Sequence, residues 1–194
     1  LRAVAEDFIK HYETRVAEGA TVAGKAMFVC SNRNIAYDFY KIVKELRPEW
    51  TEKKICDDGV VLSEKDKKEL KPMEKIKLVM TRNKDDEKDL FDMLGTKEDR
   101  KEFDRQFKNP KSNFKIAIVV DMWLTGFDVP ELDTIYIDKP IQQHTLIQTI
   151  SRVNRVCEGK DKGLIVDYIG IKKNMNTALK KYTNFESEEF EGVE

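Results

Sequence analysis

One apolar run near the centre of the chain constrains the fold more than any other feature. It reads KIAIVV (115–120) and is a nearly uninterrupted series of apolar, mostly β-branched residues. This composition is typical of strands buried on both faces, whereas strands with one solvated face alternate apolar and polar residues. Similar runs recur along the chain, in alternation with segments of helical spacing. This alternation predicts an α/β fold with an open, mainly parallel β-sheet flanked by helices.

The other elements are expected from periodicity and from Pro and Gly breaks. Val4, Phe8 and either His11 or Tyr12 recur at helical spacing and predict a helix over 1–18 that ends near Gly19. Further strands are expected at 25–30, 76–80, 134–137 and 163–168, with a weaker one at 53–62; further helices are expected at 35–46, 63–71 and 143–156, and at the start of the tail from 171.

Two local features refine this outline. Ser31 or Asn32 can cap the helix that starts near residue 35, and Pro48 ends it. Charged residues dominate 81–113, where the DDEKD run is interpreted as a solvated face. The apolar residues of this segment predict short helices anchored on the core: Leu90, Phe91, Leu94, Phe103 and Phe107.

Composition excludes several classes of protein. The 35 Lys and Arg balance 36 Asp and Glu, so any contact with nucleic acid must be local rather than spread over a basic coat. No apolar run reaches the roughly 20 residues of a membrane span, and no signal peptide is visible. Cys30, Cys56 and Cys157 are far apart and form no metal-ligand pattern. We therefore expect reduced thiols, a cytoplasmic protein and no metal site.

The stretch QTISRVNR (148–155) carries the densest candidate chemistry. If it is helical throughout, Gln148, Arg152 and Arg155 share one face, because residues three and four apart are neighbours on a helix. Two guanidinium groups beside an amide suit a ligand rich in phosphate. The alternative is a solvated helix face with an incidental arginine pair.

Loops after the strands supply further candidates, because ligands of parallel sheets gather at the carboxyl ends of strands. Three such segments carry polar residues: 31–34, 121–128 and the approach to Gln148. Gly126 would let the backbone approach a ligand, and Asp128 could accept hydrogen bonds from a ribose hydroxyl. Alternatively, Gly126 serves a turn that Asp128 caps. Trp123 and Phe127 are expected to be packing residues.

The chain has no phosphate-binding loop of the GxxxxGK[ST] type. Its only Gly-Lys pair, Gly24-Lys25, is followed by Ala26 and precedes a strand, whereas that loop requires Ser or Thr and opens a helix. The β- and γ-phosphates and the Mg²⁺ of a nucleotide are therefore not gripped here in the usual way. If the chain handles ATP, we expect it to supply half of the site.

Three motifs together resemble the second RecA-like domain of superfamily 2 helicases and translocases, in particular the motor (R) subunit of type I restriction enzymes. KAMFVCSNRNIA (25–36) resembles helicase motif IV, and VVDMWLTGFDVPELDTIYIDKP (119–140) resembles motif V in its restriction-enzyme form. QTISRVNR fits motif VI. The downstream GLIVDYIG (163–170) is also similar to that family, and the resemblance covers roughly 20–170.

The resemblance implies roles for matching residues. Arg152 and Arg155 would face the γ-phosphate of ATP as arginine fingers, and Gln148, Gly126 and Asp128 would lie near the nucleotide. The remaining matches imply contacts with the nucleic-acid backbone: Ser31, Asn32, Arg33 and Thr125. Two departures favour a DNA translocase over an RNA helicase, namely Val120 where many helicases have Thr and Thr125 where DEAD-box proteins have Arg.

The resemblance also implies an organisation and partners. Residues 1–20 would connect from a preceding domain, 21–170 would form helicase domain 2 with an insert at 81–113, and 171–194 would begin a following region. The implied cofactor is ATP, with Mg²⁺ held mainly by a first RecA-like domain of the same polypeptide. Implied partners are double-stranded DNA and the modification and specificity subunits of a bacterial or archaeal restriction complex. The alternatives are a non-catalytic scaffold or partner-binding module, and another superfamily 2 helicase or remodeller.

Overall fold

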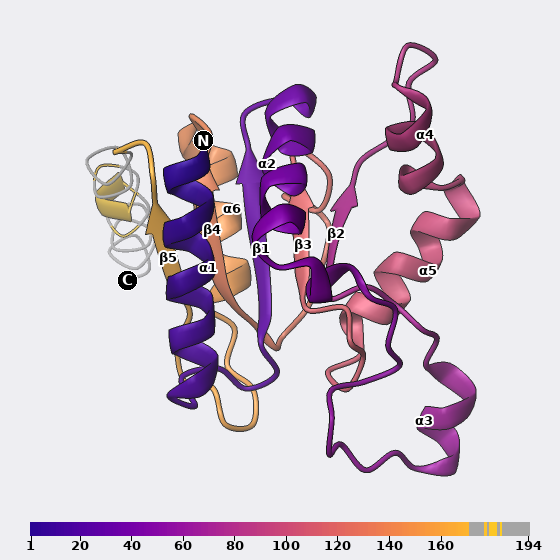
Figure 1. Ribbon diagram of the computed structural model, residues 1–194. Coiled ribbons are helices and arrows are strands. Elements are labelled where there is room, and N and C mark those ends of the chain that lie inside the picture. Colours follow the sequence, from indigo (N-terminus) through magenta and orange to yellow (C-terminus); the bar gives the residue numbers. More distant parts are fainter. Residues whose placement is uncertain (171–176, 178, 182, 184–194) are drawn as a thin grey trace.

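The protein is described by a computed structural model that covers residues 1–170, 177, 179–181 and 183 (Figure 1). The expected helical tail, 171–194, lies largely outside these residues. No helix in the described part of the chain is both long enough and apolar enough to span a membrane.

A five-stranded sheet forms the centre of the molecule, in the order β2-β3-β1-β4-β5. All of its strand pairs are parallel, which confirms the predicted fold class. The apolar run 115–120 contains β3, which lies between β2 and β1 and is buried along its whole length. The strands are β1 Lys25–Cys30, β2 Ile76–Val79, β3 Ile116–Val119, β4 Leu132–Asp138 and β5 Leu164–Asp167.

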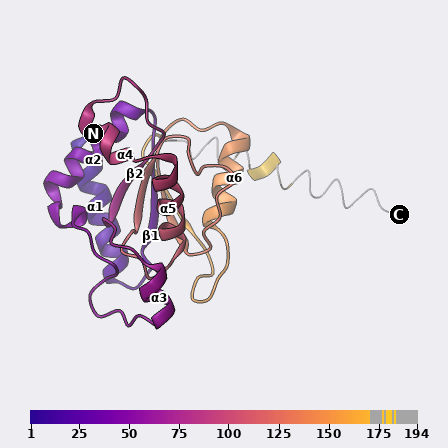
Figure 2. The same cartoon turned by 90° about the vertical axis from the view of Figure 1, so that its right-hand side faces the viewer.

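Helices cover both faces of the sheet, as Figures 1 and 2 show. One face packs against α1, α2 and α4, and the other against α5, α6 and the segment between β3 and β4. The helices are α1 Arg2–Ala17, α2 Arg33–Leu46, α3 Glu64–Glu69, α4 Lys88–Leu94, α5 Lys97–Lys108 and α6 Gln143–Val153, with a 3-10 turn at Pro48–Thr51.

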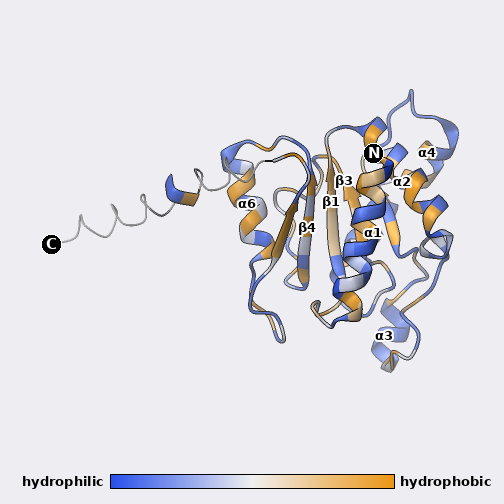
Figure 3. Cartoon of the chain, turned by 60° about the vertical axis from the view of Figure 1, so that its left-hand side comes forward, coloured by the Kyte–Doolittle hydropathy of each residue, from blue (hydrophilic) through white to orange (hydrophobic). Residues whose placement is uncertain are grey.

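The apolar residues of α1, which recur at helical spacing in the sequence, pack against the sheet. Ala5, Phe8, Ile9 and Tyr12 of α1 fall on one helical face and are all buried. The Phe8 ring meets the ring of Tyr136 on β4 edge-on, with 4.8 Å between centroids. Figure 3 shows the same segregation across the molecule, with hydrophobic strands inside and hydrophilic residues on exposed elements such as α3. The α1 helix is therefore part of the core of this domain.

The helix after β1 starts as predicted. Asn32 caps α2, and its Oδ1 accepts a hydrogen bond of 3.0 Å from the backbone N–H of Ile35. The helix ends at Leu46, two residues before Pro48.

The charged segment 81–113 forms α4 and α5. Leu90 and Leu94 enter one core and Phe107 enters the other, which confirms the predicted anchors at these three positions, while Phe103 is partly buried and Phe91 is exposed. Thr96 and Asp99 form a capping box that starts α5.

The weak strand expected at 53–62 does not form, so that prediction was wrong. Only Lys54 makes an isolated antiparallel bridge, with Met73. The Asp57-Asp58-Gly59 sequence instead makes a turn, in which the Val60 N–H donates to the Asp57 carbonyl. Ile55 and Val61 are 42% and 87% exposed, so no sheet face covers their side chains. Apolar composition alone does not make a strand, because the preference for strands depends on packing against neighbouring strands.

A lysine is buried at the start of β1. Lys25 is fully buried; its Nζ donates a 2.6 Å hydrogen bond to the Phe114 carbonyl, and burial lowers its pKa well below 10.5, with Lys115 adding to this effect. At a pH between the pKa of Lys25 in the folded chain and its pKa in the unfolded chain, the unfolded chain binds more protons than the folded chain. The free energy of unfolding should therefore rise with pH in this range, by up to about 1.4 kcal/mol per pH unit.

We therefore expect Lys25→Met to remove this rise. Met keeps the length of the side chain and carries no titrating group. The free energy of unfolding of both chains, measured by urea titration from about pH 7 to about pH 10, gives the comparison. Parallel pH profiles for the two chains would show that Lys25 titrates normally.

Candidate functional site

The helix that carries the arginine stretch is shorter than predicted. α6 begins at Gln143, as expected, but ends at Val153 rather than Val156. Asn154 is its C-cap, and its N–H makes the last helical bond, to the Ile150 carbonyl at 3.0 Å. Arg155 therefore lies beyond the helix. Arg152 and Arg155 do not share a helical face, so that prediction was wrong, because the chain turns there to reach β5.

Both arginines nevertheless meet the same loop. Arg152 Nε donates a 3.0 Å hydrogen bond to the carbonyl oxygen of Leu124. Arg155 Nη1 pairs with Asp128 Oδ2 at 2.6 Å, and both of these side chains are 53% exposed. An exposed pair of this kind contributes at most about 1 kcal/mol to stability. Its main consequence is geometric, because it fixes where the Arg155 guanidinium lies.

The loop that receives them, 121–131, crosses one face of the sheet. It leaves the carboxyl end of β3 at Asp121, where Lys139 Nζ bonds the Val120 carbonyl at 3.0 Å and also pairs with Asp121. It ends at the start of β4, since Leu132 lies in register with Lys25, the first residue of β1. Asp128 is therefore close to the amino edge of the sheet.

Segments 31–34 and the approach to Gln148 follow the carboxyl ends of β1 and β4, as expected, whereas the expectation was wrong for 121–128, which starts at that edge and runs toward the other. Residues 31–34 lie at the carboxyl edge, after β1. Arg155 and Asp128 lie toward the amino edge, beyond the end of α6 and before β4. The sequence-based expectation failed because the β3–β4 connection contains no helix and runs the full height of the sheet as a loop.

The electrostatics of the arginine pair favour an anionic ligand. Burial lowers the pKa of the Arg152 guanidinium, Asp128 opposes this, and the neighbouring positive charge of Arg155 lowers it further. A guanidinium stays charged even so. Within the described residues, the remaining guanidinium nitrogens of both arginines donate no hydrogen bond to the protein. These nitrogens can therefore donate to phosphate oxygens.

The other predicted nucleotide-site residues lie on the same face. Gln148 is half-buried on α6, and its Nε2 lies 3.0 Å from His144 Nε2. Gly126 is exposed on the 121–131 loop, as is its neighbour Thr125, which was predicted to contact nucleic acid. Gly126 has φ of 72°, and a Cβ there would meet nothing within 4 Å. Glycine is thus required by the left-handed backbone and not by a close protein contact.

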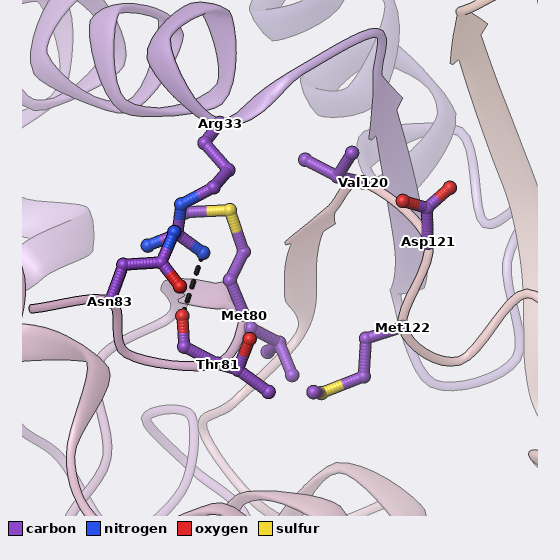
Figure 4. A pocket seen from close by; sticks show the side chains of 8 residues that line it. Arg33, Met80, Thr81, Asn83, Val120, Asp121 and Met122 are labelled. Atoms are coloured by element: carbon purple, nitrogen blue, oxygen red, sulfur yellow. Dashed lines mark hydrogen bonds between the residues drawn. The ribbon is translucent and has the colours of Figure 1, made fainter.

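Among the predicted nucleic-acid residues, Arg33 lines a separate cavity of about 410 Å³ at the carboxyl edge (Figure 4). Arg33, Thr81 and Val120 are among the residues that line it. Arg33 Nη1 donates to the Thr81 carbonyl at 2.6 Å, and its Nη2 contacts both carboxylate oxygens of Asp86 at 2.6 and 2.7 Å. Ser31 is half-buried, and Asn32 uses its side chain as the α2 cap.

Asp86 is the residue that sequence reasoning missed here. Burial alone would raise its pKa, but the Asn83 N–H and the Arg33 guanidinium outweigh that effect, and the pKa is lowered. Its side chain is only 7% exposed, although it belongs to the run interpreted as a solvated face. The available signal was that Asp86 follows Asn83 by three residues, the spacing at which its carboxylate accepts from the Asn83 N–H at 2.7 Å.

The all-parallel five-stranded sheet with helices on both faces defines an open α/β domain, in which one loop holds both Arg152 and Arg155. A solved fragment assigned as an HsdR subunit of a type I restriction enzyme from Vibrio vulnificus YJ016 has this fold. Its TM-score is 0.59 at 15% identity, over 90% of this chain and 28% of that one. Residues 22–170 match the family described as type I restriction enzyme subunit R domain 3.

The chain belongs to that family and corresponds to the second RecA-like helicase domain of the R subunit. It is 39% identical to the type I restriction enzyme HindI endonuclease subunit of Haemophilus influenzae, over 93% of this chain and 16% of that subunit. Identity is also 39% to an endonuclease subunit assigned as MjaIXP in Methanocaldococcus jannaschii, over 95% of this chain and 15% of the relative. The resemblance seen in the sequence is confirmed. The chain spans about one sixth of these relatives.

Proposed function

We propose that this domain supplies the arginine half of a shared ATP site in a DNA-translocating motor. One observation carries the proposal: Arg152 and Arg155 are both held by the 121–131 loop through single nitrogens, and their other nitrogens can bind phosphate. The sequence has no phosphate-binding loop of its own, so the nucleotide would be gripped by a first RecA-like domain.

The residues present fit ATP as half of a site. Arg152 and Arg155 would donate to the γ-phosphate, while Gln148, Gly126 and Asp128 lie where the nucleotide would approach. Among the described residues no group of three metal-ligating side chains exists, and Asp128 is already paired with Arg155, so Mg²⁺ would be held by the other domain. When the cleft closes, the guanidinium charges would stabilise charge that develops on the transferred phosphoryl group.

The same closure would move DNA. The proposed contacts with the DNA backbone, from Ser31, Asn32 and Arg33 of the carboxyl-edge loop and from Thr125, would carry no sequence information, as a translocase requires. Arg33 would have to share its guanidinium with Asp86 in such a contact. Double-stranded DNA, the first RecA-like domain and the modification and specificity subunits are thus the proposed partners, in the cytoplasm of a bacterium or archaeon.

We expect the isolated 194-residue chain to hydrolyse no ATP, with or without duplex DNA, because it contributes only arginines to the site. The intact subunit should hydrolyse ATP, with stimulation by duplex DNA and not by RNA. A coupled assay for phosphate release on both proteins tests this. Turnover by the isolated chain would show that it holds a complete site, and stimulation by RNA alone would favour an RNA helicase.

A further inference from the structure

Two aromatic rings close the tip of the 121–131 loop. The rings of Trp123 and Phe127 are stacked, with centroids 4.1 Å apart and an interplanar angle of 3°. Trp123 has φ of 68° and is the one non-glycine residue of the described chain with positive φ. A bulky residue costs free energy in this conformation, and it persists only where its surroundings hold it. The stack on Phe127 is the shortest of the ring contacts that hold it, which also include Phe107 and Phe114.

The stack rests on the core at one side of the loop. Phe127 is buried, and its ring lies 6.0 Å from that of Phe107 on α5, while the Trp123 ring lies 5.3 Å from the same ring. Lys108 Nζ lies 5.0 Å from the centre of the Phe127 ring. The Trp123–Phe127 ring pair is therefore anchored on α5. This helix belongs to the charged segment 81–113, which matches no helicase motif.

The residues fixed by the stack are the two acceptors of the arginine pair. Leu124, which follows Trp123, is buried, and its carbonyl oxygen accepts from Arg152 Nε. Asp128, which follows Phe127, pairs with Arg155. Each ring thus immediately precedes one acceptor. The stack of the two rings therefore constrains the distance between the Leu124 carbonyl and the Asp128 carboxylate. Through these two acceptors it constrains the positions of both guanidinium groups.

We propose that Trp123 and Phe127 form an aromatic clamp that positions Arg152 and Arg155 for the nucleotide. The catalytic part of this inference rests on the proposed function, whereas the structural part does not. Trp123 touches no nucleotide in this account and acts only through the arginines, so it is a positioning residue. Errors of about 1 Å in such groups can lower a rate by about 10²-fold.

The positioning of the arginines by the clamp is tested on the 194-residue chain. NMR measures the rate at which the arginine Nε–H groups exchange their hydrogen with solvent. The Arg152 signal, identified by its loss in Arg152→Lys, should be protected in the parent chain. Trp123→Ala should speed its exchange by roughly tenfold or more, and Trp123→Phe should restore protection. Trp50→Phe, which changes the other tryptophan on the opposite face, should have no effect.

Should Trp123→Ala not fold, Phe127→Leu keeps apolar volume in the core and removes the stack, and the same loss of protection is expected. Unchanged exchange at Arg152 in a folded variant without the stack would overturn the clamp. This readout involves no ATP, so it stands even if Arg152 and Arg155 prove to have no role in hydrolysis.

In the intact subunit, Trp123→Ala should lower kcat for ATP by about 10²-fold with the ATP Kd unchanged, and Trp123→Phe should recover most of the rate. Loss of ATP binding together with kcat would instead indicate general damage to the domain. Wild-type kcat in Trp123→Ala, in a subunit where Arg155→Ala loses turnover, would show that the clamp does not govern the arginines, whereas normal turnover in both variants would refute the proposed function.

Discussion

Replacing Arg155 by Ala in the intact subunit is expected to lower ATP turnover by about 10³- to 10⁵-fold, the range seen for arginine fingers. The reason is geometric as well as electrostatic. Arg155 lies beyond the end of α6, is 53% exposed and is oriented by Asp128, so its free nitrogens face solvent where another domain could close. ATP binding should remain measurable, because the first domain grips the β- and γ-phosphates. Steady-state hydrolysis and a fluorescent-nucleotide titration together make the measurement.

Arg105 offers a matched control for this variant. It is 55% exposed and pairs with Glu102 at 2.6 Å, so its exposure and ion pairing resemble those of Arg155. It lies on α5 and not on the arginine cluster. Arg105→Ala should leave turnover near the wild-type value. Normal turnover in Arg155→Ala would refute the arginine-finger assignment, and an equal loss in both variants would point to a general effect of removing surface arginines.

Substitution of Gly163 by Ala is expected to destabilise the domain by about 3 kcal/mol, at the upper end of the usual cost of overpacking. A Cβ at this position would lie 2.0 Å from the carbonyl oxygen of Val153 and 2.7 Å from its Cγ2. The first contact is with backbone at the last residue of α6, which cannot move without shifting the helix end. The free energy of unfolding of the isolated chain, measured by urea titration, tests this.

Gly19→Ala is the control for a glycine that lacks such contacts. Gly19 has φ of 67°, and a Cβ there would meet nothing within 4 Å. The cost should be about 1 kcal/mol, from the left-handed backbone alone. A smaller loss in Gly163→Ala than in Gly19→Ala would show that the end of α6 and the start of β5 can separate freely. Because Arg155 lies between these two points, this result would also weaken the case for a fixed arginine position.

Sequence reasoning succeeded where structure follows from local pattern. The 115–120 run is β3 in the centre of the sheet, Asn32 caps α2, and Leu90, Leu94 and Phe107 anchor the charged segment. It failed where a neighbour decides the outcome. The 53–62 segment has apolar residues but pairs with no strand of the sheet, and α6 stops at Val153 because the chain must turn toward β5.

The candidate site divides in the same way. The residue types were visible in the sequence, since Arg152, Arg155 and Asp128 all belong to recognisable motifs. Their arrangement was not, because Arg155 and Asp128 are 27 residues apart and meet only through the path of the 121–131 loop. Likewise, Arg33 was a candidate for DNA, but its pairing with Asp86, 53 residues away, became visible only in the folded chain.

The sequence by itself determined the parallel α/β class, the family and the absence of a phosphate-binding loop, because buried strands, motif spacing and loop chemistry are encoded within short stretches. Only the tertiary structure decided which nitrogen of each arginine is engaged, that the two candidate regions lie toward opposite edges of the sheet, and that Trp123 stacks on Phe127. These features depend on contacts between distant segments, and the free energy of such contacts exists only once the core has brought the segments together.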